Sequence, residues 1–356
     1  MALDIRKMLK IMLERRASDI HITANSPVHL RIDEDLVPLD DKVLTSEEAK
    51  SGIYGILDQE QIRQFERDWE LDFSFESEKV ARFRVNVFYQ RRHIGCAIRL
   101  IPFEIMNFKE CGLPIKVVTE LCNKPRGLVL VTGATGSGKS TTLASMIDYI
   151  NSTRQCHIVT IEDPIEFVHT NKKAIVDQRE VYKDTHSFGE SLKHVLRQDP
   201  DVILIGEMRD LETIESALII AETGHLVFAT LHTSEAVQTI NRIIDVFGAY
   251  QQQQIRTQLS FVLLGVLSQQ LLPKAAEKGR SLATEVLIAT PAIRSLIREG
   301  KVHQIYSIIQ TSQKDGMKTM NQALADLCNA GVVSHEISIS RSISPDELNK
   351  LITIHK

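Results

Sequence analysis

The stretch GATGSGKS at residues 133–140 constrains the fold of this chain more than any other feature. It satisfies the pattern GxxxxGK followed by Ser or Thr, comes after the apolar run LVLV and precedes the helical pattern STTLASMIDYI. Glycines let the backbone curl so that successive N–H groups point at phosphate oxygens, and the positive end of the following helix adds to the attraction. The sequence therefore predicts a phosphate-binding loop (P-loop) between a buried strand and a helix.

Each residue of this loop has a predicted part in binding ATP and Mg²⁺. Lys139 supplies a mobile cation for the outer phosphates, and Ser140 offers its hydroxyl to Mg²⁺. A chance glycine-rich turn is the alternative, but the strand, the spacing and the helix are all present. The predicted nucleotide-binding residues are Gly133, Ala134, Thr135, Gly136, Ser137, Gly138, Lys139, Ser140 and Thr141.

Acidic residues that hydrolysis needs follow two other apolar runs. Hydrolysis requires a carboxylate to hold or deprotonate water and acids to fix Mg²⁺ through its water shell. Glu207 follows VILIG, but Gly206 takes the first place of the acidic pair usual in a Walker B segment. The segment TIEDPIEF supplies Glu162, Asp163 and Glu166, which can make good the missing acid. Helix capping or a solvated loop is the alternative for these acids, with less weight for Glu166 and Glu207.

Two histidines, His225 and His232, flank the apolar run LVFATL. A lone histidine is usually structural, and no cysteine or histidine lies at metal-ligand spacing beside either one. We expect this pair to read the γ-phosphate of the nucleotide or to link it to the neighbouring strand.

Two stretches with strict alternation, residues 81–89 and 94–100, predict a β-hairpin near the N-terminus. If its tip is the Arg-Arg pair at 91–92, Arg84 lies directly opposite Arg99 on the face away from the core, and two like charges so placed repel. Such a basic pair suits a domain that closes over ATP and neutralises developing charge. A solvated strand face is the alternative, because exposed arginines are common.

The pattern along the chain predicts an α/β protein with two domains joined by a linker. Residues 1–101 mix short helices and strands, which is typical of a small α+β domain. Residues 102–115 show no sustained period and are interrupted by prolines, so we interpret them as the linker. In residues 116–356, apolar runs alternate with longer helical segments, which indicates a largely parallel sheet. After Tyr250 we expect mostly helices.

Charge and hydropathy exclude several other classes of protein. The 356 residues carry 42 Lys plus Arg and 46 Asp plus Glu, and the net charge of −4 gives no overall attraction to nucleic acid. The most apolar stretch, residues 261–272, is interrupted by polar residues and falls short of the roughly 20 residues that span a bilayer. The five cysteines form no CxxC, so neither a disulfide framework nor a structural zinc site is predicted, and a reducing cytoplasm is expected.

Together these motifs resemble the type IV pilus retraction ATPases, the PilT family of the secretion ATPase superfamily. The likeness covers nearly the whole chain and rests on long matches: ASDIHIT, RFRVNVFYQR, GATGSGKSTTLASMIDYIN, TIEDPIEF, QREV, LRQDPDVILIGEMRD, ETGHLVFATLHT, SQQLLP, AIRSLIREGK and GMKTMNQAL. The resemblance implies a PAS-like N-terminal domain joined to a RecA-like ATPase core, six chains in a ring, and ATP-driven removal of pilin subunits from the pilus base.

The resemblance also implies a role for each candidate residue. Residues 292–299 are similar to the family's C-terminal retraction motif. The implied roles are Walker A for Lys139 and Ser140, Walker B catalytic glutamate for Glu207, Asp box and Mg²⁺ binding for Glu166, His box for His225 and His232, and nucleotide contact for Arg84 and Arg99.

The implied partners are other copies of the chain in a hexameric ring, an inner-membrane pilus platform protein and, as a further candidate, a paralogous pilus ATPase. The implied location is the cytoplasmic face of the inner membrane, with neither membrane insertion nor nucleic acid expected. Ala134 and Ser295 replace the usual proline and asparagine, which leaves open a divergent member such as the motor of a specialised pilus or a PilU-like accessory motor. A weakly hydrolysing, nucleotide-gated module at the pilus base is a second alternative, which the presence of Lys139 and Glu207 disfavours. A nucleic-acid translocase is a third alternative. Assembly ATPases carry a tetracysteine zinc insertion, and its absence favours retraction.

Overall fold

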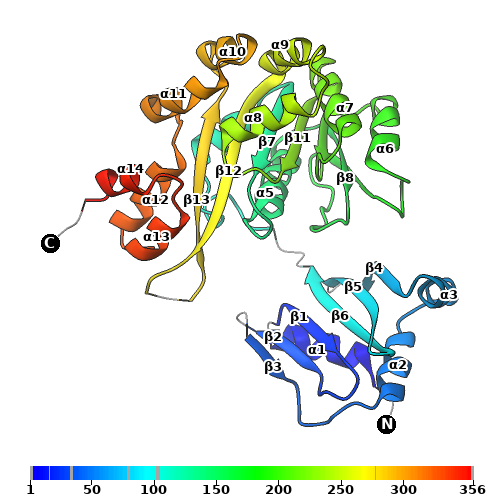
Figure 1. Ribbon diagram of the computed structural model, residues 1–356. Coiled ribbons are helices and arrows are strands. Elements are labelled where there is room, and N and C mark those ends of the chain that lie inside the picture. Colours follow the sequence, from blue (N-terminus) through cyan, green and yellow to red (C-terminus); the bar gives the residue numbers. More distant parts are fainter. Residues whose placement is uncertain are drawn as a thin grey trace. The chain divides into compact units, whose positions relative to one another are not determined.

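The computed structural model describes residues 3–15, 17–32, 35–77, 81–101, 105–276 and 278–353 (Figure 1). The chain divides into two compact units, residues 1–104 and 105–356. This division falls within the segment 102–115 that the sequence predicts as a linker. Within that segment, Phe108 and Leu113 are buried in the core of the second unit, and residues 102–104 lie outside the described ranges.

In its described residues, the first unit is an antiparallel sheet with the helices α1, α2 and α3, as its mixed sequence pattern predicts. The sheet order is β3-β2-β1-β6-β5-β4. Helix α1 begins where Asp4 accepts a hydrogen bond from the Lys7 amide, and it buries Ile5, Leu9 and Met12 at helical spacing. The elements are α1 (Ile5–Glu14), β1 (Asp19–Ile22), β2 (His29–Ile32), β3 (Asp35–Pro38), α2 (Ser46–Tyr54), α3 (Gln59–Asp68), β4 (Glu70–Ser77), β5 (Ala81–Gln90) and β6 (His93–Ile101).

The predicted hairpin and its register are confirmed. Strands β5 and β6 pair antiparallel with Arg84 opposite Arg99. Both tip residues, Arg91 and Arg92, adopt positive φ angles, 48° and 66°, which suit a two-residue turn that follows the twist of the strands. The repulsion expected between the facing arginines is relieved by β1, where Asp19 stands on the other side of Arg99 and accepts a 2.8 Å hydrogen bond from its Nε.

The second unit is built on a sheet with the order β13-β12-β7-β11-β10-β8-β9, in which every neighbouring pair except β12–β13 is parallel. The apolar runs LVLV, VILI and LVFATL lie in strands of this sheet, and the arrangement confirms the predicted largely parallel α/β sheet. The strands are β7 (Gly127–Thr132), β8 (His157–Glu162), β9 (Ile175–Glu180), β10 (Val202–Ile205), β11 (Leu226–Leu231), β12 (Leu263–Pro273) and β13 (Arg280–Ile288).

The expectation of mostly helices after Tyr250 is wrong in one important place. Strands β12 and β13 form a long antiparallel hairpin, and β12 pairs with the P-loop strand β7. Two of the polar residues that interrupt this apolar run are buried and make side-chain hydrogen bonds: Thr132 Oγ1 donates to Ser268 Oγ at 2.9 Å, and Gln269 Nε2 donates to Thr142 Oγ1 at 2.7 Å. Since β12 is covered on both faces, its sequence shows no alternation that marks it as a strand.

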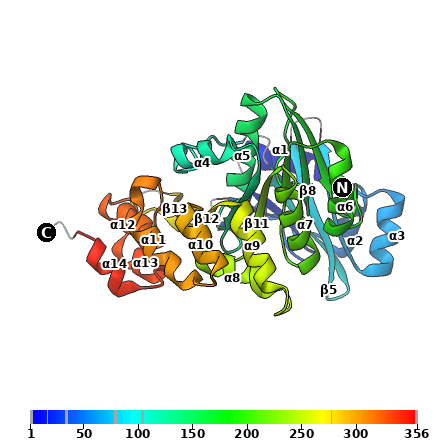
Figure 2. The same ribbon diagram turned by 90° about the horizontal axis from the view of Figure 1, so that it is seen from above.

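Helices cover both faces of this sheet, so two cores lie on opposite sides of it. Helices α4 and α5 pack on one face and α7 to α9 on the other (Figure 2). No helix in the described ranges is long and apolar enough to cross a membrane. The helices are α4 (Ile115–Cys122), α5 (Lys139–Thr153), α6 (Phe188–Val195), α7 (Leu211–Glu222), α8 (Ala236–Asp245), α9 (Gln252–Val262), α10 (Pro291–Arg298), α11 (Ile305–Thr311), α12 (Met320–Asn329), α13 (His335–Arg341) and α14 (Pro345–Leu351).

The ion pair between Asp19 and Arg99 predicts that the Asp19→Asn variant is less stable than the wild type. Burial raises the pKa of Asp19, but hydrogen bonds from Ser18 and Arg99 outweigh burial and hold the pKa below its usual value. Because folding lowers this pKa, the carboxylate stabilises the fold above about pH 4, and the contribution is lost as the pH falls through the folded-state value. We expect Asp19→Asn to lower the free energy of unfolding at pH 7 by about 1 kcal/mol.

The measurement is urea unfolding followed by the fluorescence of Trp69, the single tryptophan of the chain, which lies in the first unit. The difference between wild type and variant should shrink below pH 4. Asp35→Asn, which neutralises an exposed carboxyl on the edge strand β3, is the matched control. Equal unfolding free energies for wild type and Asp19→Asn at pH 7 would contradict a stabilising role of this ion pair.

Candidate functional site

The P-loop follows β7, and its last two residues, Lys139 and Ser140, begin α5, as predicted. All three of its glycines adopt positive φ angles: Gly133 (144°), Gly136 (78°) and Gly138 (90°). A side chain at Gly133 would place Cβ 2.5 Å from both Gln269 O and Ser137 Oγ, so glycine is required where β12 approaches the loop. Gly138 begins α5 without a side-chain cap. The first N–H groups of the helix therefore remain available for an anion.

Lys139 is buried at the centre of the loop. Its Nζ donates to Gly133 O at 2.8 Å and to Ala134 O at 3.1 Å. Burial lowers the pKa of Lys139, while the nearby carboxylates of Glu207 and Glu166 act in the opposite direction. The structure thus brings together three of the predicted catalytic residues, although they come from three separate segments of the chain.

Glu207 is held by two basic side chains at the end of β10. Its Oε1 lies 2.7 Å from Arg209 Nε and 3.0 Å from His232 Nε2, and its side chain is 19% exposed. Burial raises the pKa of Glu207, but Arg209 and His232 outweigh burial, so the pKa lies below the usual value. Thr230 Oγ1 donates to Gly206 O at 2.6 Å and fixes the end of β11 against this turn. The carboxylate is therefore charged and oriented before any nucleotide binds.

Gly206 explains why the usual acidic pair is absent here. Its N–H donates to Ile161 O at 2.8 Å, and an added Cβ would lie 3.2 Å from the Cα of Glu162. The Glu162 carboxylate from the neighbouring strand accepts hydrogen bonds from Thr160 Oγ1 at 2.7 Å and Gln178 Nε2 at 3.1 Å. Burial raises the pKa of Glu162 to about 7. Glu162, the last residue of β8 and part of TIEDPIEF, thus lies beside Gly206, where the Walker B segment lacks its usual acid.

The donor set fits Mg²⁺ that arrives with a nucleotide. In the part of the chain that the structure describes, no three His, Cys, Asp or Glu side chains are grouped so as to hold a metal ion. Ser140 lies in the first turn of α5, and the exposed Glu166 lies on the segment after β8. One hydroxyl and one carboxylate, completed by phosphate oxygens and water, match the way Mg²⁺ is bound in nucleotide sites.

His225 does not join this cluster within one chain. It precedes β11 and lies at the opposite end of that six-residue strand from His232, about 20 Å away at strand spacing. Its Nδ1 lies 3.2 Å from Thr223 Oγ1 and from Ile220 O. The sequence correctly indicated that both histidines flank one strand, but they lie at opposite ends of that strand and therefore far from each other.

Arg84 and Arg99 lie in the first unit, on the polar face of its sheet. Arg99 pairs with Asp19, yet its side chain remains 67% exposed.

Arg209, which contacts Glu207, was not predicted from the sequence. Its position two residues after Glu207 in GEMRD could have indicated this contact.

Residues 292–299, the predicted retraction motif, belong mostly to α10. Arg294 points inward and binds the C-terminal end of α9 through hydrogen bonds to Ser260 O (2.6 Å), Phe261 O (2.6 Å) and Leu263 O (2.8 Å). Carbonyls at a helix end lack partners within the helix, so the guanidinium satisfies acceptors that would otherwise be unpaired. The first half of the motif therefore has a structural task in this chain.

Comparison with known proteins agrees with this geometry. Residues 1–338 match the family model described as type II/IV secretion system protein. The chain belongs to this family. Among curated members of the type II/IV secretion system family, the type IV pilus retraction ATPase PilT of Pseudomonas aeruginosa is 49% identical over 97% of this chain and 99% of its own length.

A second relative and a solved structure complete the comparison. The type IV pilus ATPase PilU of Pseudomonas aeruginosa is 40% identical over 99% of this chain and 92% of its own length. A crystal structure of the pilus retraction motor PilT with bound ADP matches with a TM-score of 0.91 and 51% identity, over 98% of this chain and 99% of that chain. The RecA-like α/β core expected from the motifs is thus the fold of the family.

The close approach at Gly133 predicts a sharp difference between two glycine variants. Gly133→Ala adds a collision with the Gln269 carbonyl to the strain of a positive φ angle, whereas an added Cβ at Gly136 meets nothing within 4 Å. We expect Gly136→Ala to weaken nucleotide binding by roughly tenfold, which corresponds to about 1–2 kcal/mol of strain, and Gly133→Ala to weaken it much further. Titration with a fluorescent ADP analogue measures both affinities, and equal affinities would contradict the predicted role of Gly133.

Proposed function

We propose that this chain is the ATP-hydrolysing motor of type IV pilus retraction. The observation that carries the proposal is the convergence of Lys139, Glu166 and Glu207 at a P-loop in a chain 49% identical to a retraction ATPase over nearly its whole length. These residues at the P-loop support ATP hydrolysis. The similarity to a retraction ATPase supports retraction of the pilus, as opposed to its assembly.

The residues of the second unit suggest how ATP is cleaved. Loop amides and the first turn of α5 bind the phosphates, and Lys139 leaves the loop carbonyls to neutralise the outer ones. Glu207, already charged and oriented by Arg209 and His232, accepts the proton of the attacking water. Ser140 and Glu166 hold Mg²⁺, which neutralises charge on the phosphates when it is bound.

The same proposal extends to the first unit and to assembly. We propose that Arg84 and Arg99 contact the nucleotide and that the PAS-like unit moves against the core as ATP is cleaved. The motor is proposed to work as a hexameric ring in the cytoplasm, against an inner-membrane pilus platform protein. The chain's net charge of −4 gives no overall attraction to nucleic acid, so we propose no nucleic-acid partner.

A PilU-like accessory motor, or a weakly hydrolysing module that responds to nucleotide, is the second candidate. It is favoured by the 40% identity to PilU over almost the whole chain. The presence of both Lys139 and Glu207 favours an active motor. A steady-state ATPase assay of the purified chain separates the two, since a weak module shows nucleotide binding with little turnover.

The mechanism predicts that Glu207→Gln separates binding from turnover. The amide keeps the size of the side chain but cannot accept a proton, so we expect kcat to fall by about 10²–10⁴-fold. Binding of a fluorescent ATP analogue should stay within a fewfold of wild type. Glu212→Gln, an exposed acid on α7, is the matched control and should keep normal turnover. Normal turnover in Glu207→Gln would remove this residue from the mechanism.

The biological role predicts the phenotype of a deletion strain. Loss of a retraction motor should leave excess surface pili and no twitching, whereas loss of an assembly motor should leave cells without pili. Pili are counted by electron microscopy after shearing, and motility is scored on agar. Complementation with wild type but not with Glu207→Gln would tie the phenotype to ATP hydrolysis.

A further inference from the structure

The segment that carries Glu166, residues 163–174 between β8 and β9, has neither helix nor strand. The Glu166 carboxylate is exposed and makes no hydrogen bond or ion pair with the residues that the structure describes. Its own contacts therefore do not fix its position beside Lys139. The backbone of the segment must do so, and the question is what holds that backbone.

Two side chains of β9 hold the first half of the segment. Glu180, which is buried, accepts a hydrogen bond from the Ile165 amide at 3.4 Å. Gln178 uses both ends of its amide: Oε1 accepts from the His169 N–H at 2.7 Å, and Nε2 donates to Phe167 O at 2.8 Å. Gln178 and Glu180 are two residues apart on one strand, so they face the same side. They bind the backbone on both sides of Glu166.

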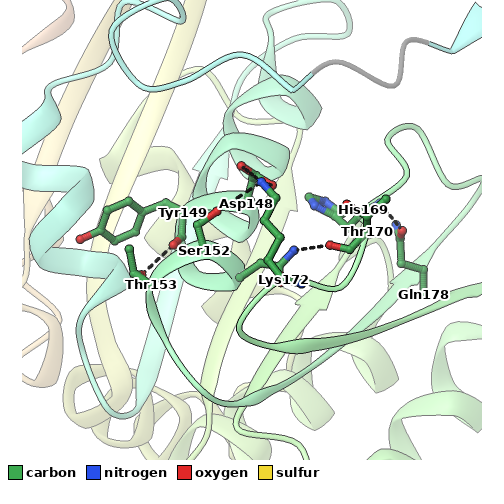
Figure 3. A network of polar contacts seen from close by, with 9 residues as sticks. Asp148, Tyr149, Ser152, Thr153, His169, Thr170, Lys172 and Gln178 are labelled. Atoms are coloured by element: carbon green, nitrogen blue, oxygen red, sulfur yellow. Dashed lines mark hydrogen bonds and ion pairs between the residues drawn. The ribbon is translucent and has the colours of Figure 1, made fainter.

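A third side chain, the amide of Asn151, holds the second half and comes from the P-loop helix. Asn151, fully buried on α5, donates from Nδ2 to Thr170 O at 2.8 Å and accepts from the Lys172 N–H at 3.0 Å. The Lys172 ammonium reaches back to Asp148 at 2.6 Å (Figure 3). Figure 3 shows His169 with Gln178 at one end of this network and Lys172 with α5 at the other.

Gln178 also touches the acid beside the vacant Walker B position. Its Nε2 lies 3.1 Å from Glu162 Oε1, so one amide group joins the Glu166 segment to the carboxylate at the end of β8. Irregular backbone packed against a protein needs partners for its N–H and C=O groups, and a fully satisfied network fixes one geometry. These contacts connect QREV and the end of STTLASMIDYIN to the segment that carries Glu166.

We propose that Gln178, with Glu180 and Asn151, is a positioning residue for Glu166 in ATP hydrolysis. These side chains hold residues 163–174 as a rigid strap between β9 and α5, and the strap sets the Glu166 carboxylate against the P-loop. The inference rests on the proposed role of Glu166 in turnover. It adds that the precision of that role comes from the side chains of Gln178, Glu180 and Asn151, which bind the backbone of the strap.

The test uses two substitutions of Gln178 in the full chain. Gln178→Met keeps the volume and removes all three hydrogen bonds. Gln178→Glu keeps an acceptor for the His169 N–H but cannot donate to Phe167 O or Glu162. In Gln178→Met the His169 N–H loses its acceptor and Phe167 O loses its donor, so hydrogen exchange at residues 165–170 should quicken by about tenfold. In both variants kcat should fall by roughly ten- to a hundredfold, while the dissociation constant for a fluorescent ADP analogue stays near wild type.

The control and the decisive outcomes follow from neighbouring residues. Asp177→Asn changes the adjacent β9 residue, whose side chain contacts His157 instead of the strap, and should leave kcat and exchange at 165–170 unchanged. A purely structural role would lower the melting temperature of Gln178→Met and leave kcat intact, and that result overturns the proposal. Unchanged exchange at residues 165–170 in Gln178→Met overturns it as well.

Glu166→Gln separates this inference from the proposed function. Normal turnover in Glu166→Gln would overturn the role of Glu166 itself, and with it the purpose of the strap. Loss of turnover in Glu166→Gln together with normal turnover in both Gln178 variants would overturn only the positioning role. Loss of turnover in all three, with ADP affinity preserved, is the expected result.

Discussion

The parallel hydrogen bonding of β7, β11, β10 and β8 is the constraint on which the candidate site depends. It brings the C-terminal ends of these strands to one edge of the sheet, where the P-loop, Glu207 and His232 follow their strands directly. The pairing of these strands thereby brings together residues that are up to about ninety positions apart in the sequence. The same geometry excludes His225, which lies at the other end of β11.

Electrostatic balance within this edge supports the site as an ATP-cleaving one. Lys139 is desolvated and held by loop carbonyls, and the carboxylates of Glu207 and Glu166 act on its pKa in the direction opposite to burial. Glu207 is bound by Arg209 and His232, which keep it ionised, and the strap fixes the backbone around Glu166. Incoming phosphates would therefore meet an acid that is already in place, and only Lys139 has to exchange its loop carbonyls for phosphate oxygens, which lowers the reorganisation needed for catalysis.

Much of this could be predicted from the sequence, because its strongest signals are local. The P-loop pattern fixes a strand, a turn and a helix by spacing alone, and alternation fixed the register of Arg84 against Arg99. The misses have a common physical cause, which is dependence on contacts distant in the chain. Strand β12 is buried on both faces and has no period of two, and Asp19 reaches Arg99 through a third strand that a hairpin argument omits. Gln178 likewise has a task only once β9 lies beside β8.

The late hairpin has a larger part in the site than its place in the sequence indicates. The backbone of β12 at Gln269 lies so close to Gly133 that a single methyl group would not fit, and the same residue donates to Thr142 in α5. Further along, β12 enters the core of the C-terminal helices through Leu272. A change in the P-loop would therefore meet β12 at once, and β12 is paired with β13 from Gly265 to Pro273 and with β7 up to Ser268, so its neighbours resist a shift at one residue. This strand gives the C-terminal helices a direct mechanical connection to the phosphate-binding loop.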